Sequence, residues 1–344
     1  MRKTAVALVA LVSAWHASVA DAQDYPTMNL RLGHTYAPTT VQSQIDQWFV
    51  DEIEKRSGGK IKIRIFWSEA LGKNIEMLDL IGSGAMELGI IVPSFFPTRL
   101  PLSSITNALP LGFDSAKQAQ IIQTELVAKI PEIQEEYRRN KVWPIFSHGL
   151  GVFRLQCVKP VTTVADLKNL RIRSYGEHVP KLWGAFGAVG VTALPPEIYE
   201  GLQRGKLDCA YFPTDLAHSF KLHEVAKYWS TANFGALSTW PILVNYDVWH
   251  NKWPDNVKKL IMEVAQEAIK RDHQLVDAVE QESLEAMRKQ GGLQVIEFKE
   301  QKKMEESAPD FFAVWTESMK GKNQGDVAQR IVDLWRKRRG ELKE

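Results

Sequence analysis

The stretch Lys60-Ile61-Lys62-Ile63-Arg64-Ile65-Phe66 alternates charged and apolar residues, which predicts a β-strand with one buried and one solvated face. Before it, Leu30–Gly33 predicts a short strand, and the residues from Ile45 to Ile53 place apolar side chains at helical spacing. After it, Glu76–Ile81 indicates a helix and Leu88–Val92 a continuous apolar strand. The first part of the chain therefore repeats a strand–helix unit.

The same alternation continues further along the chain. We expect strands at Val142–Phe146, Phe153–Val158, Leu170–Arg173, Leu207–Phe212 and Thr239–Asn245, with helices between most of them. Helices between strands favour a largely parallel sheet that is covered on both faces. The expected fold class is therefore α/β.

One predicted helix is much longer than the others. No Gly or Pro occurs between Pro254 and Gln290, and Gly291-Gly292 then ends the run. At 1.5 Å per residue this helix would reach roughly 55 Å, which is longer than a single small domain is wide. We expect it to span two lobes, and the alternative is two helices with a break near Arg271-Asp272.

The N-terminus has the pattern of a secretory signal peptide. Met1–Lys3 is positively charged, Ala5–Ala14 is apolar apart from Ser13, and Ala20-Asp21-Ala22 supplies small residues for cleavage after Ala22. The apolar run is too short to cross a bilayer core of roughly 30 Å. We therefore expect an exported protein without a membrane anchor.

Composition excludes several classes of protein. The 344 residues include 43 Lys plus Arg and 41 Asp plus Glu, so the chain has no basic excess of the kind that binds nucleic acid. Two cysteines cannot hold a chain of this length together as a disulfide scaffold. Cys157 and Cys209 lie in two predicted strands, and either a bridge or two buried thiols is compatible with the sequence.

Catalytic and metal-binding motifs are not found. The chain lacks G-x-S-x-G, the phosphate-binding loop, H-E-x-x-H and C-x-x-C, and its eight histidines are scattered. Glu197 and Asp208 are the candidates for an acid–base pair, but a Glu after Pro195-Pro196 is typical of the first turn of a helix. We therefore expect no enzyme, no cofactor and no metal.

Two arginines share one face of a predicted strand. In Leu170-Arg171-Ile172-Arg173, apolar and basic residues alternate, so both guanidinium groups project from the same side. A buried arginine needs an anion, which is either an internal carboxylate such as Asp166 or a ligand carboxylate. This segment alone favours the internal partner.

Ordered motifs surround this strand from Leu30 to Pro254. The upstream set is Leu32–His34, Ser57–Lys60, Leu71-Gly72 and Ile81–Gly84 with Glu87, and the downstream set is Arg154, Pro160–Thr162, Asp166–Leu170, Arg173 and Pro196–Asp208. Together they closely resemble the TRAP transporter solute-binding proteins of the DctP type.

The resemblance implies a two-lobed periplasmic binding protein fold, with a strand hinge and a long helix that spans both lobes. Lobe I would hold residues 23–151 plus 239–272, and lobe II residues 152–238 plus 273–344. Such a protein captures a small organic acid in the periplasm and delivers it to the membrane permease subunits of a TRAP transporter. We expect a monomer, although Trp315 and Trp335 leave self-association or ordinary packing open.

The resemblance also assigns a binding site. Arg173 matches the family arginine that holds the ligand carboxylate, and Arg154 matches a second basic position. Phe212 stands where sialic acid binders of the family carry Asn, and Val92 and Phe95 stand roughly where they carry Glu and Arg. The candidate binding residues are Arg173, Arg154, Phe212, Phe95, Tyr36, Ser94, Tyr175 and Tyr211.

These residues favour a monocarboxylate with an apolar or aromatic body over a sugar acid. The alternative for each ring is a place in the core, and a dicarboxylate stays open through Arg171 or Arg99. Ala210-Tyr211-Phe212 replaces acidic residues of metal-using family members, so no metal is expected. The alternative functions are an exported hydrolase with a Trp-lined carbohydrate cleft, and a ligand-sensing receptor for a membrane kinase.

Overall fold

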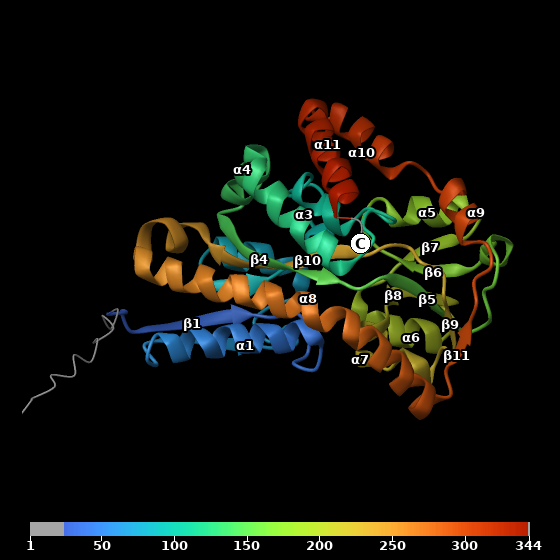
Figure 1. Cartoon of the computed structure of the whole chain (residues 1–344), viewed down its shortest axis with the longest axis horizontal. Helices are drawn as coiled ribbons and strands as arrows, with labels where there is room; N and C mark the ends of the chain where they lie inside the picture. Colours follow the sequence, from blue (N-terminus) through green and yellow to red (C-terminus); the bar gives the residue numbers. More distant parts are fainter. Residues whose placement is uncertain (1–23, 343–344) are drawn as a thin grey trace, which may run out of the picture.

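The computed structural model describes residues 24–342, which form two α/β lobes crossed by one long helix (Figure 1). The expected signal peptide, with its cleavage after Ala22, lies outside the described residues. Among residues 24–342, none of the helices combines the length and the apolar character that a membrane crossing requires.

The first lobe is built on a five-stranded sheet with the order β2-β1-β3-β10-β4. Its strands are β1 (Met28–Gly33), β2 (Ile61–Phe66), β3 (Leu88–Ile90), β4 (Val142–Leu150) and β10 (Leu237–Asn245). The helices of this lobe are α1 (Val41–Arg56), α2 (Met77–Gly82), α3 (Ala116–Lys129) and α4 (Pro131–Arg139). β1 runs parallel to β2 and β3, whereas β10 runs antiparallel to β3 and β4.

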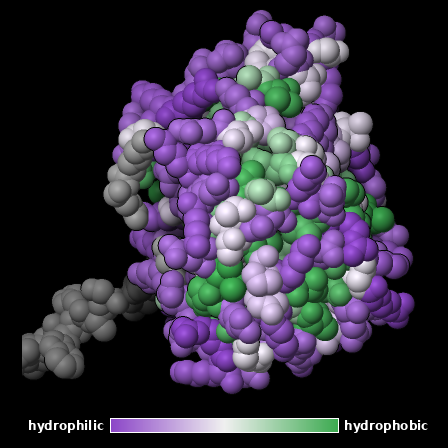
Figure 2. All heavy atoms as spheres, turned by 90° about the vertical axis from the view of Figure 1, so that its right-hand side faces the viewer, coloured by the Kyte–Doolittle hydropathy of each residue, from purple (hydrophilic) through white to green (hydrophobic). Residues whose placement is uncertain are grey.

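The second lobe is built on a six-stranded sheet with the order β11-β9-β5-β8-β6-β7. Its strands are β5 (Phe153–Cys157), β6 (Arg171–Ser174), β7 (Val189–Thr192), β8 (Cys209–Pro213), β9 (Tyr228–Ser230) and β11 (Gln294–Ile296). Its helices are α5 (Val179–Ala185), α6 (Ile198–Gln203) and α7 (Thr214–Ser219). Hydrophilic residues cover much of the outer face of this lobe, with apolar residues between them (Figure 2).

The predicted α/β class is confirmed, and every expected strand forms within a few residues of its predicted bounds. The expectation of a largely parallel sheet is wrong, because both sheets are mixed. β6 runs parallel to β7 and β8, but β5 is antiparallel to β8 and β9. The reason is that the chain leaves the first lobe through β4 and returns through β10, and these crossing strands pair with each other antiparallel.

The long helix α8 (Asp255–Gly291) is continuous over 37 residues. The alternative of two helices with a break near Arg271-Asp272 is therefore wrong. Gly292 ends the helix at φ 63°, a left-handed conformation that suits glycine. α8 contacts α1 and β4 in the first lobe and α7 in the second, so it spans both lobes as expected (Figure 1).

Three helices follow the second sheet: α9 (Gln301–Ser307), α10 (Phe311–Lys320) and α11 (Gly325–Glu341). Trp315 and Trp335 are both buried within the chain, and Trp335 stacks on Phe113 with their ring centroids 4.2 Å apart. Packing rather than self-association therefore accounts for both tryptophans. Because α11 contacts α3 of the first lobe, the expected assignment of residues 273–344 to lobe II stays a proposal.

A buried network of two histidines and two aspartates holds the first lobe together. His148 on β4 lies between Asp46 on α1, with Nε2 to Oδ1 at 3.0 Å, and Asp272 on α8, with Nδ1 to Oδ1 at 2.9 Å. His34 on β1 contacts the other oxygen of Asp46. Burial disfavours a charged imidazole, but the two flanking carboxylates outweigh it and raise the pKa of His148 to about 10.

We expect the stability of the protein to fall as the pH rises from 7 to 10. The pKa of His148 lies above its unfolded value of about 6.5, so its contribution is complete below that pH and is lost as the pH rises through the folded pKa. The slope should be at most about 1.4 kcal/mol per pH unit. Urea unfolding of wild type and His148→Gln at pH 7, 8.5 and 9.5 measures it. Exposed His250→Gln is the control and should keep the pH dependence of wild type. Parallel pH profiles for wild type and His148→Gln would contradict the claim that His148 causes the loss of stability.

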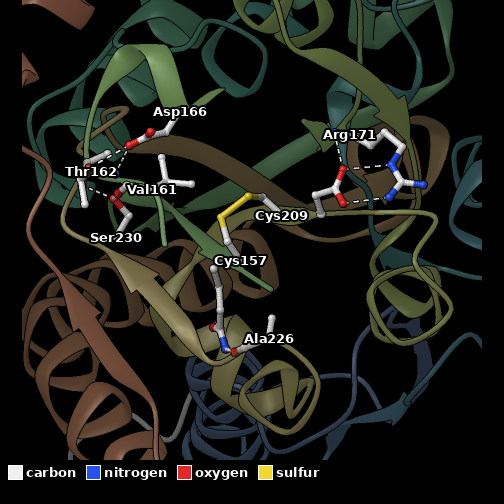
Figure 3. Close-up of a disulfide and its surroundings, with 11 residues drawn as sticks. Cys157, Val161, Thr162, Asp166, Arg171, Cys209, Ala226 and Ser230 are labelled. Carbon is white, nitrogen blue, oxygen red and sulfur yellow. Dashed lines mark hydrogen bonds and ion pairs between the residues drawn. A yellow bond between two sulfur atoms is a disulfide. The ribbon is translucent and has the colours of Figure 1, made fainter. Parts of the chain in front are cut away.

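Cys157 and Cys209 form a disulfide (Figure 3). They lie directly opposite each other on antiparallel β5 and β8, with their Cα atoms 4.0 Å apart. The structure therefore decides the question that the sequence left open. The bridge closes a chain segment of 52 residues that includes β6 with Arg173, and so ties this segment to β5.

Removing this bridge should lower the free energy of unfolding by up to roughly 4 kcal/mol, because a loop of this length is strongly constrained in the unfolded chain. The test is denaturant unfolding of the Cys157→Ala/Cys209→Ala double variant under oxidising conditions, compared with wild type. The unfolding midpoint of wild type treated with reductant should approach that of the double variant. Equal midpoints for oxidised wild type and the double variant would show that the bridge does not stabilise the fold.

Candidate functional site

The site is centred on Arg173, which lies on β6 toward its carboxyl end, where ligands of open α/β sheets bind. Its side chain is buried, with 3% of the residue exposed. Nε donates a hydrogen bond to the carbonyl of Ala193 at 3.1 Å, and Nη1 donates to the carbonyl of Tyr211 at 3.3 Å. Within residues 24–342, no carboxylate forms an ion pair with this guanidinium.

Two aromatic rings cover the Arg173 guanidinium. Its Cζ lies 4.3 Å from the ring centroid of Tyr175 and 5.3 Å from that of Phe212. Burial lowers the pKa of Arg173, yet a guanidinium keeps its charge at any physiological pH. The carbonyls of Ala193 and Tyr211 accept from two of its five N–H donors. Both acceptors are neutral, so the described chain supplies no counter-ion for the positive charge.

Tyr175 and Tyr211 carry two buried hydroxyl groups in the second lobe. Their rings stack with centroids 6.2 Å apart, and both hydroxyl oxygens are buried without a hydrogen-bond partner in the described chain. Burial raises the pKa of both phenols, so both keep their protons. Each hydroxyl is therefore neutral and has an unused O–H donor.

Residues of the first lobe lie against this group. Tyr36 meets Phe220 of the second lobe edge-on at 6.4 Å, and Phe95 meets Tyr175 edge-on at 6.5 Å. A Cβ added to Gly176 would lie 3.6 Å from the Cβ of Ser94. The two lobes are thus in contact beside Arg173, which is buried.

Seven of the eight candidate residues come together at this boundary. Tyr36, Ser94 and Phe95 come from the first lobe, and Arg173, Tyr175, Tyr211 and Phe212 from the second. Ser94 donates its hydroxyl to Asn107 Oδ1 at 2.5 Å, so its oxygen is already hydrogen-bonded. The part that each residue takes in binding stays a prediction.

Arg154 is placed differently. It lies opposite Phe212 in the strand register, but its Nε donates to Glu280 of α8 at 2.8 Å and its Nη1 donates to the Thr231 carbonyl at 2.9 Å. Its Cζ also lies 4.9 Å from the Trp229 ring. Arg154 therefore has an internal counter-ion, and its expected help to the ligand stays a prediction.

The other charged side chains considered in the sequence analysis also have partners within the chain. Arg171 is exposed and pairs with Asp208, as Figure 3 shows, and Arg99 pairs with Asp79. Asp166, the possible internal partner of Arg173, instead accepts hydrogen bonds from Thr162 and Thr163. The internal partner that the strand alone favoured is therefore not Asp166.

Sequence reasoning missed two parts of the boundary. Trp240 is buried in an irregular part of β10 at φ 52°, and it stacks on Tyr36 with centroids 3.8 Å apart. No pattern in the sequence signals this conformation, which is rare for a bulky residue. Gln42 is fully buried on α1, and a signal existed for it, because Gln42, Ser43 and Asp46 interrupt the apolar face of that helix.

A family model described as bacterial extracellular solute-binding protein, family 7 (DctP), matches residues 32–318. Among curated proteins, the 2,3-diketo-L-gulonate-binding periplasmic protein YiaO of Escherichia coli (strain K12) is 26% identical over 273 residues. The match covers 78% of this chain and 80% of that protein.

Two solved structures share the fold. A TRAP periplasmic solute binding protein from Desulfovibrio salexigens with bound orotic acid superposes with a TM-score of 0.79 at 22% identity, covering 92% of this chain and 99% of that one. The extracytoplasmic solute receptor DctP7 of Bordetella pertussis, which binds pyroglutamic acid, gives a TM-score of 0.79 at 18% identity, covering 90% and 99%. At these identities the likeness establishes the fold.

Proposed function

We propose, from the premise that this chain belongs to the DctP family of bacterial extracellular solute-binding proteins, that it captures a small organic acid and delivers it to the membrane permease subunits of a TRAP transporter. The protein would work in the periplasm after its signal peptide is removed. Capture and release need only the opening and closing of the lobes, so no chemical reaction is assigned.

The observation that carries this proposal is the uncompensated charge of Arg173. A buried cation without a counter-ion is strongly unfavourable, so an anion from outside is the simplest partner. A planar guanidinium matches a carboxylate in shape and donates two parallel hydrogen bonds to it. The Tyr175 ring lies over the same guanidinium, and its buried hydroxyl has no hydrogen-bond partner in the described chain.

We further propose a monocarboxylate with an apolar or aromatic body. Phe212, Phe95 and Tyr36 supply ring surface around the charge, and Arg171 and Arg99 are engaged by carboxylates of the chain. Orotic acid and pyroglutamic acid, which bind to two proteins of this fold, each present one carboxylate on a ring. They are reasonable first compounds to test.

The hydrolase alternative finds no support at its proposed carboxylates. Glu197 accepts a hydrogen bond from the Leu194 backbone at the start of a short helix, and Asp208 pairs with Arg171. Both carboxylates are therefore hydrogen-bonded by other groups of the chain. The family match likewise points to solute binding.

A thermal-shift screen of organic acids tests the proposed function. A ligand at a hundred times its dissociation constant should stabilise the protein by roughly 2.7 kcal/mol. For any compound found, Arg173→Ala should weaken binding roughly a hundredfold, because the ligand carboxylate would be desolvated without its partner.

Arg171→Ala is the matched control, since Arg171 lies two residues away on the same strand, is exposed and pairs with Asp208. Isothermal titration calorimetry should find its affinity within about threefold of wild type. An affinity that survives in Arg173→Ala would refute the proposed pairing of Arg173 with the ligand carboxylate.

Phe212→Asn separates a binding ring from a core ring. It should weaken an aromatic or alkyl acid roughly tenfold, because the apolar wall over the ligand becomes polar. The melting temperature without ligand should change little. A large fall in the ligand-free melting temperature, with unchanged affinity, would assign Phe212 to the core instead.

A further inference from the structure

A short helical turn of the first lobe carries two of the candidate binding residues to the lobe boundary. This turn, η2 (Pro93–Phe95), is a 3₁₀ helix of three residues, and within the described chain no side chain caps its start. Phe95 meets Tyr175 of the second lobe edge-on, and the Cβ of Ser94 lies 3.6 Å from where a Cβ on Gly176 would be. A 3₁₀ turn this short has few hydrogen bonds of its own, so its orientation depends on what holds it from behind.

Asn107 supplies that support from within the first lobe. It is the last residue of a second 3₁₀ helix, η3 (Ser103–Asn107), and its side chain is buried. Its amide oxygen Oδ1 accepts the hydroxyl of Ser94 at 2.5 Å and the backbone N–H of Ser94 at 3.4 Å. Because a backbone N–H can only donate, the contacted amide atom is the oxygen, and the Ser94 hydroxyl donates to it as well. One oxygen therefore fixes both the backbone and the side chain of Ser94.

The helix η3 is in turn anchored to two longer helices. Buried Glu136 of α4 accepts the backbone N–H groups of Leu102 at 2.7 Å and Ser103 at 2.8 Å, where η3 begins. Thr106 donates its hydroxyl to Oε1 of Gln123 on α3 at 2.5 Å. The helix that carries the supporting amide is therefore fixed to α3 and α4.

We propose that Asn107 is a positioning residue of the binding site. It holds Ser94 and Phe95 in the orientation that closes on the ligand, and it acts through Ser94 without touching the ligand itself. This inference deepens the proposed function and rests on it only for the presence of a ligand.

The contacts lead from this amide to the centre of the site. Asn107 fixes Ser94, which is the neighbour of Phe95. Phe95 meets Tyr175 edge-on, and the Tyr175 ring lies over the Arg173 guanidinium. Without Oδ1, both donors of Ser94 would lose their acceptor, and η2 would be free to adopt several orientations. The two bonds lie within the first lobe, so they do not depend on whether the lobes are open or closed.

Hydrogen exchange of the ligand-free protein, measured by mass spectrometry, tests this support directly. Asn107→Leu keeps a side chain of similar volume but has no acceptor, so the amide hydrogens of residues 94–96 should exchange roughly tenfold faster than in wild type. Asn107→Asp keeps an acceptor oxygen and should restore their exchange to within about threefold of wild type. The exchange of residues 61–66 in β2 should stay the same in every variant.

Ile105→Val is the matched control, because Ile105 is buried on the same helix η3 and its substitution removes one methyl group without changing a hydrogen bond. It should leave the exchange of residues 94–96 within about threefold of wild type. If Asn107→Leu does not fold, Ser94→Ala removes the same hydroxyl bond from the other side and should also speed exchange there. Equal exchange of residues 94–96 in wild type and the variant without this bond overturns the proposal. A rise that is just as large in β2 also overturns it, because the substitution would then loosen the whole fold instead of η2.

Binding gives a second readout, with orotic acid and pyroglutamic acid as the probes. For either acid that wild type binds, Asn107→Leu should weaken the affinity roughly tenfold, because a loosened η2 must be ordered on binding, and Asn107→Asp should recover it. An affinity that is unchanged in Asn107→Leu overturns the positioning role. If wild type binds no organic acid at all, the proposed function fails, and the exchange measurement still decides whether Asn107 holds η2.

Discussion

The proposed binding site depends on one interaction that the described chain does not complete, which is between the Arg173 guanidinium and an anion. Two ring faces and two carbonyls hold this cation at the boundary between the lobes, and its charge is left without a counter-ion of the described chain. In the buried setting an incoming carboxylate gains much more than it would in water. The same setting makes this buried charge unfavourable without a carboxylate, so under the proposed function the charge would couple capture to closure.

The rest of the fold keeps each side of that boundary rigid. In the first lobe, the histidine–aspartate network joins β1, α1, β4 and α8 through four buried side chains. In the second lobe, the disulfide fixes β8 to β5 beside the strand that carries Arg173. The crossing strands β4 and β10 and the contacts between the lobes, which include Tyr36 with Phe220, lie outside these two fixed regions.

Local patterns predicted the local elements well. Alternation placed the strand at Lys60–Phe66, and the absence of Gly and Pro placed the whole of α8, because both signals act over neighbouring residues. Pairings between distant residues were not predictable in this way. The Glu280 partner of Arg154 lies 126 positions away, and the antiparallel return of β10 depends on how the lobes connect. The family motif singled out Arg173 in the sequence. Only the structure showed that no carboxylate of the described chain pairs with it.

The bridge between Cys157 and Cys209 also bears on how the protein matures. In a reducing cytoplasm these thiols stay apart, so a precursor of this chain would lack the stabilisation that closing this segment supplies. A less stable precursor spends more time unfolded, which is the form that a secretion channel accepts. Oxidation after export would then join β5 to β8 beside the strand that carries Arg173, so the same covalent link that finishes the second lobe would also make its folding hard to reverse.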